Sequence, residues 1–274
     1  MSDGDASQDG ELNIFEAPEG YYPPEKQPTS ASYRTLSGVE LRLRLIGHSP
    51  LWGHLLWNAG RTLATYLEQH AQTLIANKTV LELGAGAGLP SLICALHGAQ
   101  KVLVTDYPEA ELIENLRLNV ASHAHLFPQA KGEGVIYAEG YLWGAEARGL
   151  LDYLSPAAPG SQAGFDLLIL GDLLFNHSEH AKLLSTVRFT LKRSASAQAL
   201  VFFTPYRPWL LEADLAFFDL ARAGGFVVEK LMEHVMEQVM FDEDPGDEGL
   251  RRTVFGYSLR WDLAGETDGK GGEA

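Results

Sequence analysis

The residues that could do chemistry begin in a stretch where a hydrophobic run passes into a glycine-rich turn. Residues 80–91 read Val-Leu-Glu-Leu-Gly-Ala-Gly-Ala-Gly-Leu-Pro-Ser, with glycine at every second position from Gly84 to Gly88. Glycine lets the backbone turn sharply and approach a ligand without a Cβ in the way, and Pro90 suits the first turn of a helix because its missing N–H would be unpaired there. We therefore expect a strand, a loop that binds a nucleotide-like ligand, and a helix start.

The spacing of these glycines and of two carboxylates narrows the choice of ligand. A dinucleotide fingerprint would be Gly-x-Gly-x-x-Gly, but the sixth position here is Leu89. Glu82 places a carboxylate just ahead of the loop, which suits a cofactor with a cationic end better than one with two phosphates. Asp106 follows the next apolar run about twenty residues on, where a carboxylate can bond both hydroxyls of a ribose. A ribose without a pyrophosphate indicates S-adenosylmethionine.

A glycine-rich turn after a strand also occurs for steric reasons alone, so the argument depends on the elements around it. Beyond Asp106 comes a helical pattern, and then five apolar runs separated by helical patterns or loops. We predict strands at 134–138, 166–170, 199–204, 226–228 and 254–261, and crossover helices at 186–192 and 209–223. This alternation predicts an α/β protein with a Rossmann-like, doubly wound sheet, whose ligands lie beyond the carboxyl ends of the strands.

The chain divides into an arm, one catalytic domain and a tail. Residues 1–32 are acidic and contain several prolines, and we expect a flexible N-terminal arm. The domain is expected over 33–261, beginning with a hairpin around Ser37-Gly38 and a helix over 55–67 that delivers Trp57 toward the glycine loop. Residues 262–274, rich in Gly, Asp and Glu, predict a disordered tail.

Composition excludes several functional classes. The 274 residues are 46% hydrophobic, enough for one sizeable core. A formal charge of −15 argues against nucleic acid and favours a basic partner, although the acidity could serve solubility alone. The single cysteine, Cys94, allows no disulfide within the chain. We see no secretory leader and no apolar run near twenty residues, so we expect a cytoplasmic protein without membrane association.

Five motifs resemble a known family, the seven-strand S-adenosylmethionine-dependent methyltransferases, and within it the nicotinamide N-methyltransferase-like branch of protein lysine methyltransferases. The resemblance covers about residues 33–261. It implies a seven-stranded sheet with the last strand antiparallel. The last motif is similar to the fungal enzymes that methylate the N-terminal glycine and adjacent lysine of translation elongation factor 1-alpha. The motifs are Leu-Leu-Trp-Asn-Ala-Gly-Arg (55–61), Leu-Glu-Leu-Gly-Ala-Gly-Ala-Gly-Leu-Pro (81–90), Val-Thr-Asp-Tyr-Pro (104–108), Tyr-Leu-Trp-Gly (141–144) and Gly-Asp-Leu-Leu-Phe-Asn-His-Ser-Glu-His (171–180).

The same resemblance implies which residues hold the cofactor. Trp143 also has a physical case, because an indole offers a flat face on which adenine can stack, although a tryptophan in a core is equally ordinary. The implied contacts are Trp57 and Gly171 with the methionine end, Gly84, Ala85 and Gly86 with the backbone side, Asp106 with the ribose and Trp143 with the adenine.

Candidate catalytic residues follow the predicted strands 166–170 and 199–204. DNA amino-methyltransferases carry an Asn-Pro-Pro-aromatic motif after the fourth strand, but Asp172 to Phe175 here contains neither proline. Asp172 could accept a hydrogen bond from an attacking amine with Phe175 behind it, or it could cap the following helix. Tyr206 could complete an aromatic pocket with Trp57 and Phe175, or only pack.

We expect no metal site, because His177 and His180 have no third ligand group of the right type nearby.

Three functions remain open at this stage. The leading one is N-methylation of a protein terminus and a nearby lysine, with elongation factor 1-alpha as the substrate that the resemblance implies. The others are methylation of a small pyridine such as nicotinamide, and a non-catalytic scaffold that binds the cofactor. The sequence fixes neither the number of methyl groups added nor the oligomeric state, for which a monomer is the simplest expectation.

Overall fold

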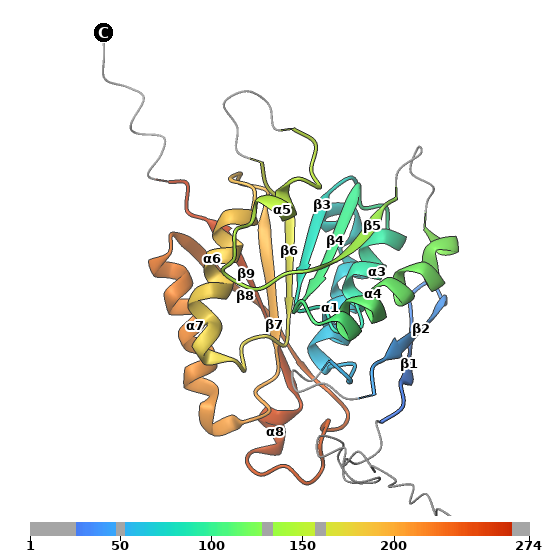
Figure 1. Cartoon of the computed structure of the whole chain (residues 1–274). Coiled ribbons are helices and arrows are strands. Elements are labelled where there is room, and N and C mark those ends of the chain that lie inside the picture. Colours follow the sequence, from blue (N-terminus) through green and yellow to red (C-terminus); the bar gives the residue numbers. More distant parts are fainter. Residues whose placement is uncertain (1–25, 48–52, 128–133, 157–162, 265–274) are drawn as a thin grey trace, which may run out of the picture.

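A seven-stranded sheet with helices on both faces forms the body of the protein (Figure 1). The computed structural model describes residues 26–47, 53–127, 134–156 and 163–264. The strands lie in the order β5-β4-β3-β6-β7-β9-β8, and β9 runs antiparallel to both of its neighbours. The strands are β3 (Thr79–Leu83), β4 (Lys101–Asp106), β5 (Ile136–Gly140), β6 (Leu167–Gly171), β7 (Gln198–Phe203), β8 (Phe226–Val235) and β9 (Thr253–Trp261). The predicted doubly wound fold is confirmed, and so is the antiparallel last strand.

Alternate residues of the central strands enter two separate cores, one on each face of the sheet. Val80 and Ile169 belong to the first core, whereas their neighbours Leu81 and Leu168 belong to the second. Strands buried on both faces are continuously apolar, which is why the sequence showed runs rather than alternation. The first core lies under α1 (Asn58–Gln69), α3 (Leu89–Leu96) and α4 (Ala110–His123), and the second under α5 (Arg148–Leu151), α6 (His180–Thr190) and α7 (Leu211–Ala223).

Short helical segments join these elements. They are α2 (Ala71–Leu74), η1 (Ala124–Leu126), η2 (His177–Glu179), η3 (Pro208–Leu210) and α8 (Glu248–Arg251).

The predicted hairpin is present, but it begins earlier than expected. Strand β1 (Thr29–Arg34) pairs antiparallel with β2 (Glu40–Leu45), so residues 29–32 belong to the hairpin and not to the predicted arm. The reason is that β1 is largely exposed and its sequence, Thr-Ser-Ala-Ser-Tyr-Arg, lacks an apolar run. The remainder of the predicted arm (1–25) and most of the predicted tail (265–274) lie outside the described residues.

The hairpin is fastened to the body of the protein through three buried polar side chains, of which Asn115 of α4 donates a hydrogen bond to the Arg44 carbonyl at 3.0 Å. Asn119 of α4 accepts a hydrogen bond from the Arg44 backbone N–H at 2.8 Å and donates to the carbonyls of Arg44 (2.9 Å) and Ala87 (3.0 Å). Because Ala87 belongs to the glycine loop, Asn119 connects the hairpin to that loop. Glu68 of α1 accepts from the Tyr33 hydroxyl at 2.7 Å and from the Leu36 N–H at 2.9 Å.

Strand β8 is longer than the sequence predicted. Its ten residues extend well past 228 and include the charged side chains of Glu229, Lys230 and Glu233. The strand lies at the edge of the sheet, where only β9 pairs with it. Charged residues on an edge strand discourage pairing with other chains. Because such a strand contains charged residues, a prediction from its apolar residues underestimates its length.

We expect Asn119→Asp to destabilise the protein by about 1–3 kcal/mol, because the carboxylate loses both donated hydrogen bonds and faces two buried carbonyls. Unfolding in urea measures the change. Gln72→Glu is the matched control, since Gln72 is an exposed amide on α2. Equal midpoints for the two variants would contradict the role assigned to Asn119.

Candidate active site

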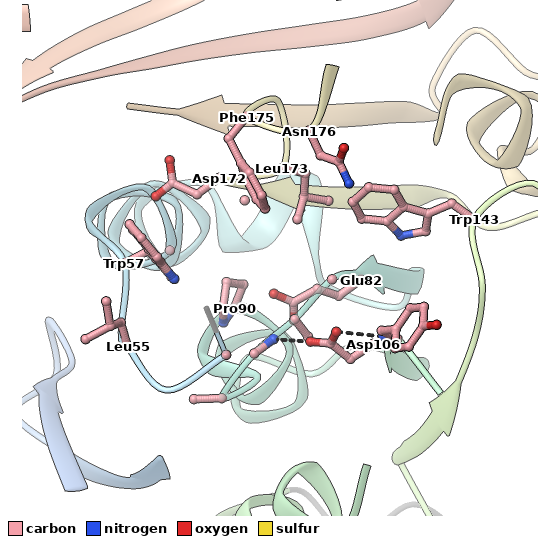
Figure 2. Close-up of a pocket in the computed structure, with 18 of the residues that line it drawn as sticks. Leu55, Trp57, Glu82, Pro90, Asp106, Trp143, Asp172, Leu173, Phe175 and Asn176 are labelled. Atoms are coloured by element: carbon pink, nitrogen blue, oxygen red, sulfur yellow. Dashed lines mark hydrogen bonds between the residues drawn. The ribbon is translucent and has the colours of Figure 1, made fainter. Parts of the chain in front are cut away.

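A cavity of about 350 Å³ opens between the parallel strands β3 and β6, where the order of the strands in the sheet reverses. Parallel sheets bind ligands at this place, beyond the carboxyl ends of the strands. Figure 2 shows the residues around the cavity, with Asp106 and Glu82 on one side and Asp172 with Trp57 on another. The structure brings together all of the predicted cofactor residues, which are Trp57, Glu82, Gly84, Ala85, Gly86, Asp106, Trp143 and Gly171.

The glycine loop has the backbone conformation that the sequence predicted. Gly84 has φ of +60°, which strains any residue with a Cβ, and a Cβ there would lie 2.5 Å from the end of the Leu173 side chain and would have to displace it. Gly86 has φ of +57°, but a Cβ at this position would meet no atom within 4 Å. The space beside Gly86 therefore lies open to the cavity, where a ligand can approach the backbone closely.

Asp106 holds the glycine loop as well as facing the cavity. One carboxylate oxygen accepts a hydrogen bond from the Gly86 N–H and the other from the Tyr107 N–H, each at 2.6 Å (Figure 2). Burial raises the pKa of Asp106, and these two hydrogen bonds partly oppose the rise. Each carboxylate oxygen has a second lone pair, so Asp106 can still accept hydrogen bonds from the hydroxyl groups of a ligand.

Glu82 is buried beneath the loop and is 2% exposed. Its Oε2 accepts a hydrogen bond from the Ser91 N–H at 2.9 Å, in the first turn of α3. Burial raises the pKa of Glu82 to about 8, with a further contribution from the charge of Asp106. The carboxyl group thus lines the cavity as expected, but it is mostly protonated at neutral pH until a cation enters.

Asp172 joins three elements at the other side of the cavity. Its Oδ1 accepts a hydrogen bond from the Thr204 N–H after β7 at 2.8 Å, and its Oδ2 accepts from the Ala59 N–H at 3.1 Å. The carboxylate therefore caps α1, and not the helix that follows it in the sequence. Burial raises the pKa of Asp172 to about 7. Its φ of +54° is unusual for a residue other than glycine and is typical of strained functional positions.

A second cavity, of about 460 Å³, adjoins the first. Both cavities are lined by Trp57, Asp172, Phe175 and Asn176, which form the boundary between them. Tyr206, predicted as a pocket residue, lines the second cavity and not the first. The other residues that line only the second cavity are Leu174, Phe203, Thr204, Arg207, Asp214, Phe241 and Asp244.

Three aromatic rings form one wall of the second cavity. The ring centroid of Trp57 lies 5.0 Å from that of Tyr206 and 5.9 Å from that of Phe241, and the Tyr206 and Phe241 centroids are 6.0 Å apart. Rings that pack against one another in this way form an apolar wall that excludes water, and a ring face turned toward the cavity attracts a cation. The sequence analysis missed Phe241 because it lies in the connection between β8 and β9, where no local motif marks it.

The two histidines of the last motif make hydrogen bonds within the protein. His177 Nε2 lies 2.7 Å from Asp214 Oδ1, and His180 Nε2 lies 2.8 Å from the Leu174 carbonyl. No group of three or more His, Cys, Asp or Glu side chains able to hold a metal ion occurs within the described ranges. None of the helices in the described part of the chain is long and apolar enough to span a membrane.

The family to which this site belongs is identified by comparison with known proteins. The model of a family described as lysine methyltransferase matches residues 40–222, which include the glycine loop, Asp106 and the segment from Gly171 to His180. The chain belongs to the lysine methyltransferase family. The match ends within α7, before the β8–β9 segment that contributes Phe241 and Asp244 to the second cavity.

Curated relatives extend this similarity over nearly the whole chain. A protein N-terminal and lysine N-methyltransferase (efm7) of Emericella nidulans is 49% identical over 249 residues, covering 91% of this chain and 95% of the relative. A protein with the same printed name from Schizosaccharomyces pombe is 41% identical over 263 residues, covering 94% of this chain and 98% of the relative. At these identities the relatives and this lysine methyltransferase share one fold and one family.

Solved structures agree on the fold. A putative S-adenosylmethionine-dependent methyltransferase from Streptococcus mutans superimposes with a TM-score of 0.51 at 14% identity, covering 86% of this chain and 56% of that chain. The YcgJ protein of Bacillus subtilis gives a TM-score of 0.50 at 13% identity, and the match covers 72% of this chain and 97% of that chain. Identities this low show the fold alone.

We expect Glu82→Gln to reduce the loss of stability that occurs as the pH rises. With a pKa raised to about 8, native Glu82 keeps a proton that the unfolded chain releases, so its contribution is present at acid pH and is lost as the pH rises toward 8. Glutamine has no proton to release and can still accept from the Ser91 N–H. Unfolding in urea at about pH 5 and about pH 8 measures the effect. We expect the free energy of unfolding of the variant, relative to that of the unchanged protein, to be higher at about pH 8 than at about pH 5.

Glu114→Gln is the control, because Glu114 is exposed on α4. If the free energies of unfolding of Glu82→Gln and of the unchanged protein differ by the same amount at both pH values, Glu82 is ionised in the native state.

Proposed function

We propose that this lysine methyltransferase-family protein transfers methyl groups from S-adenosylmethionine to the N-terminal glycine and the adjacent lysine of translation elongation factor 1-alpha. The observation that carries the proposal is the meeting of two cavities at Trp57, Asp172 and Phe175. The printed names of the relatives support a protein terminus and lysine as acceptors. The resemblance of residues 171–180 supports the particular substrate.

The first cavity suits a nucleoside that carries a cationic amino-acid end. The open space beside Gly86 admits a ligand against the backbone, and Asp106 offers free lone pairs to ribose hydroxyls. Trp143 offers an aromatic face for a base. At about 350 Å³ the cavity is within the usual range for small-molecule sites. When bound here, S-adenosylmethionine supplies a methyl group activated by its sulfonium charge.

The protein's task in such a reaction is alignment. Methyl transfer from a sulfonium is an in-line displacement, which requires no covalent intermediate with the protein. Trp57, Asp172 and Phe175 stand where the two cavities meet, so they direct an amine in the second cavity toward the first. The hydrogen bonds that Asp172 accepts from the Ala59 and Thr204 N–H groups tie this boundary to α1 and to the residue after β7.

The acceptor must be an unprotonated amine when it reacts. An N-terminal amine with a pKa near 7.7–8.0 is about a tenth neutral at pH 7, whereas lysine near 10.4 is neutral in only about one molecule in several thousand. The aromatic wall of Trp57, Tyr206 and Phe241 lowers the pKa of a lysine by removing water from it. Asp172, with a pKa of about 7, can accept a further hydrogen bond from the amine or take up its proton.

Two other functions compete with this proposal. The aromatic wall could hold a neutral pyridine such as nicotinamide, but the three carboxylates that line the second cavity have no partner in such a substrate. A non-catalytic scaffold would not need two adjoining cavities. A substrate that works in translation also places the reaction in the cytoplasm.

We expect Asp106→Ala to weaken S-adenosylmethionine binding by roughly tenfold to a hundredfold, because charge-assisted hydrogen bonds to the ribose are lost. Calorimetry measures the affinity, and a thermal melt confirms that the variant is folded. Glu111→Ala, at an exposed position of α4, is the control. An affinity equal to that of the control would remove Asp106 from the binding site.

The test of the function is incubation of the purified protein with labelled S-adenosylmethionine and purified elongation factor 1-alpha, followed by peptide mapping. A cytosolic extract serves as a second source of acceptors, and Asp106→Ala, assayed at a limiting concentration of S-adenosylmethionine, as the control with reduced activity. We expect label on the first two residues of elongation factor 1-alpha. Label on another protein overturns elongation factor 1-alpha as the substrate. Label on small molecules alone supports methylation of a pyridine, and binding of S-adenosylmethionine without methyl transfer supports a non-catalytic scaffold.

A further inference from the structure

The second cavity extends past the place where methyl transfer would occur. Four residues mark its boundary with the first cavity, and the remaining residues of its lining do not line the first cavity. Two carboxylates, Asp214 and Asp244, lie in this outer part together with the guanidinium of Arg207. Arg207 donates a hydrogen bond to the Phe175 carbonyl at 2.7 Å, so part of its hydrogen-bonding capacity is already used.

Asp214 is a buried carboxylate with one oxygen still available. It lies in the first turn of α7 and is 6% exposed. His177 Nε2 lies 2.7 Å from Oδ1 and holds the side chain in place. Within the described part of the chain, no group donates a hydrogen bond to Oδ2. The Asp214 carboxylate also interacts with the positive charge of Arg207, and its Oδ2 can accept a hydrogen bond from a cation that enters the cavity.

Asp244 reaches the same cavity from a different element. It lies in the connection between β8 and β9, three residues after Phe241 of the aromatic wall. Its side chain is exposed, and no positively charged side chain among the described residues pairs with it. This connection lies outside residues 40–222, the part of the chain that the family model matches.

We propose that Asp214 and Asp244 form a holding subsite that binds a second positive charge of the same polypeptide while the first amine lies at Trp57 and Asp172. The proposal rests on the proposed function. It explains how one transfer site can serve two neighbouring amines. While the terminal amine reacts, the side chain of the adjacent lysine occupies the holding subsite, and the two groups exchange places for the second reaction.

The charge of the cavity supports a substrate with two cations. Its lining contains three carboxylates and one guanidinium, and one carboxylate, Asp172, belongs to the boundary with the cofactor cavity. Asp214 is held by His177 through one oxygen and keeps the other for a ligand, and the exposed Asp244 has no ion pair among the described residues. A second ammonium between them gains an interaction with both carboxylates.

The experiment measures N-terminal methylation of two forms of elongation factor 1-alpha, one natural and one in which the lysine adjacent to the terminal glycine is replaced by glutamine. For the natural form, we expect Asp244→Asn to raise KM about threefold, since an exposed ion pair is weak, and Asp214→Asn to raise it about tenfold. For the glutamine form, both variants should have the KM of the unchanged protein.

Asp242→Asn is the control, because Asp242 lies in the same connection but does not line the cavity. Equal rises in KM for both substrates, or no rise for either, overturn the holding subsite. If Asp214→Asn fails to fold in a thermal melt, Asp244→Asn decides the outcome alone. Failure of the unchanged protein to methylate either substrate overturns the proposed function instead.

Discussion

The hydrogen bonds of the Asp172 carboxylate are the interaction on which the arrangement of the site depends. This side chain binds the Ala59 N–H at the start of α1 and the Thr204 N–H just after β7, and it follows β6 itself. Trp57, the residue that precedes α1, is thereby fixed at the boundary between the cavities. A side chain that draws three elements together can persist in a strained backbone conformation, because the surrounding structure determines its place.

Burial of acidic groups gives the site a second property. Glu82 and Asp172 lie on two sides of the first cavity, and burial raises the pKa of Glu82 to about 8 and that of Asp172 to about 7. Carboxyl groups that are partly protonated cost less to keep away from water, and they ionise when a positive charge arrives. A sulfonium and an ammonium are such charges. The site is therefore suited to cationic ligands without holding a full negative charge when it is empty.

The two cavities differ in which parts of the chain build them. The first cavity is made mainly by the ends of β3, β4, β5 and β6, the strands next to the reversal in strand order. The outer part of the second cavity is built by α7 and by the connection between β8 and β9. A doubly wound sheet fixes the first location in every member of the fold, whereas connections at the edge of a sheet can vary and so can set which substrate is accepted.

The sequence by itself determined the parts of this protein that arise from local patterns. Apolar runs separated by helical patterns predicted the doubly wound sheet, and the glycines of residues 84–88 predicted a sharp loop after a strand, because burial periodicity and turn chemistry are properties of neighbouring residues. The tertiary structure alone decided that Asp172 caps α1, that Phe241 joins Trp57 and Tyr206, and that His177 holds Asp214. These contacts join segments that the sheet order brings together, so no spacing within one segment could reveal them.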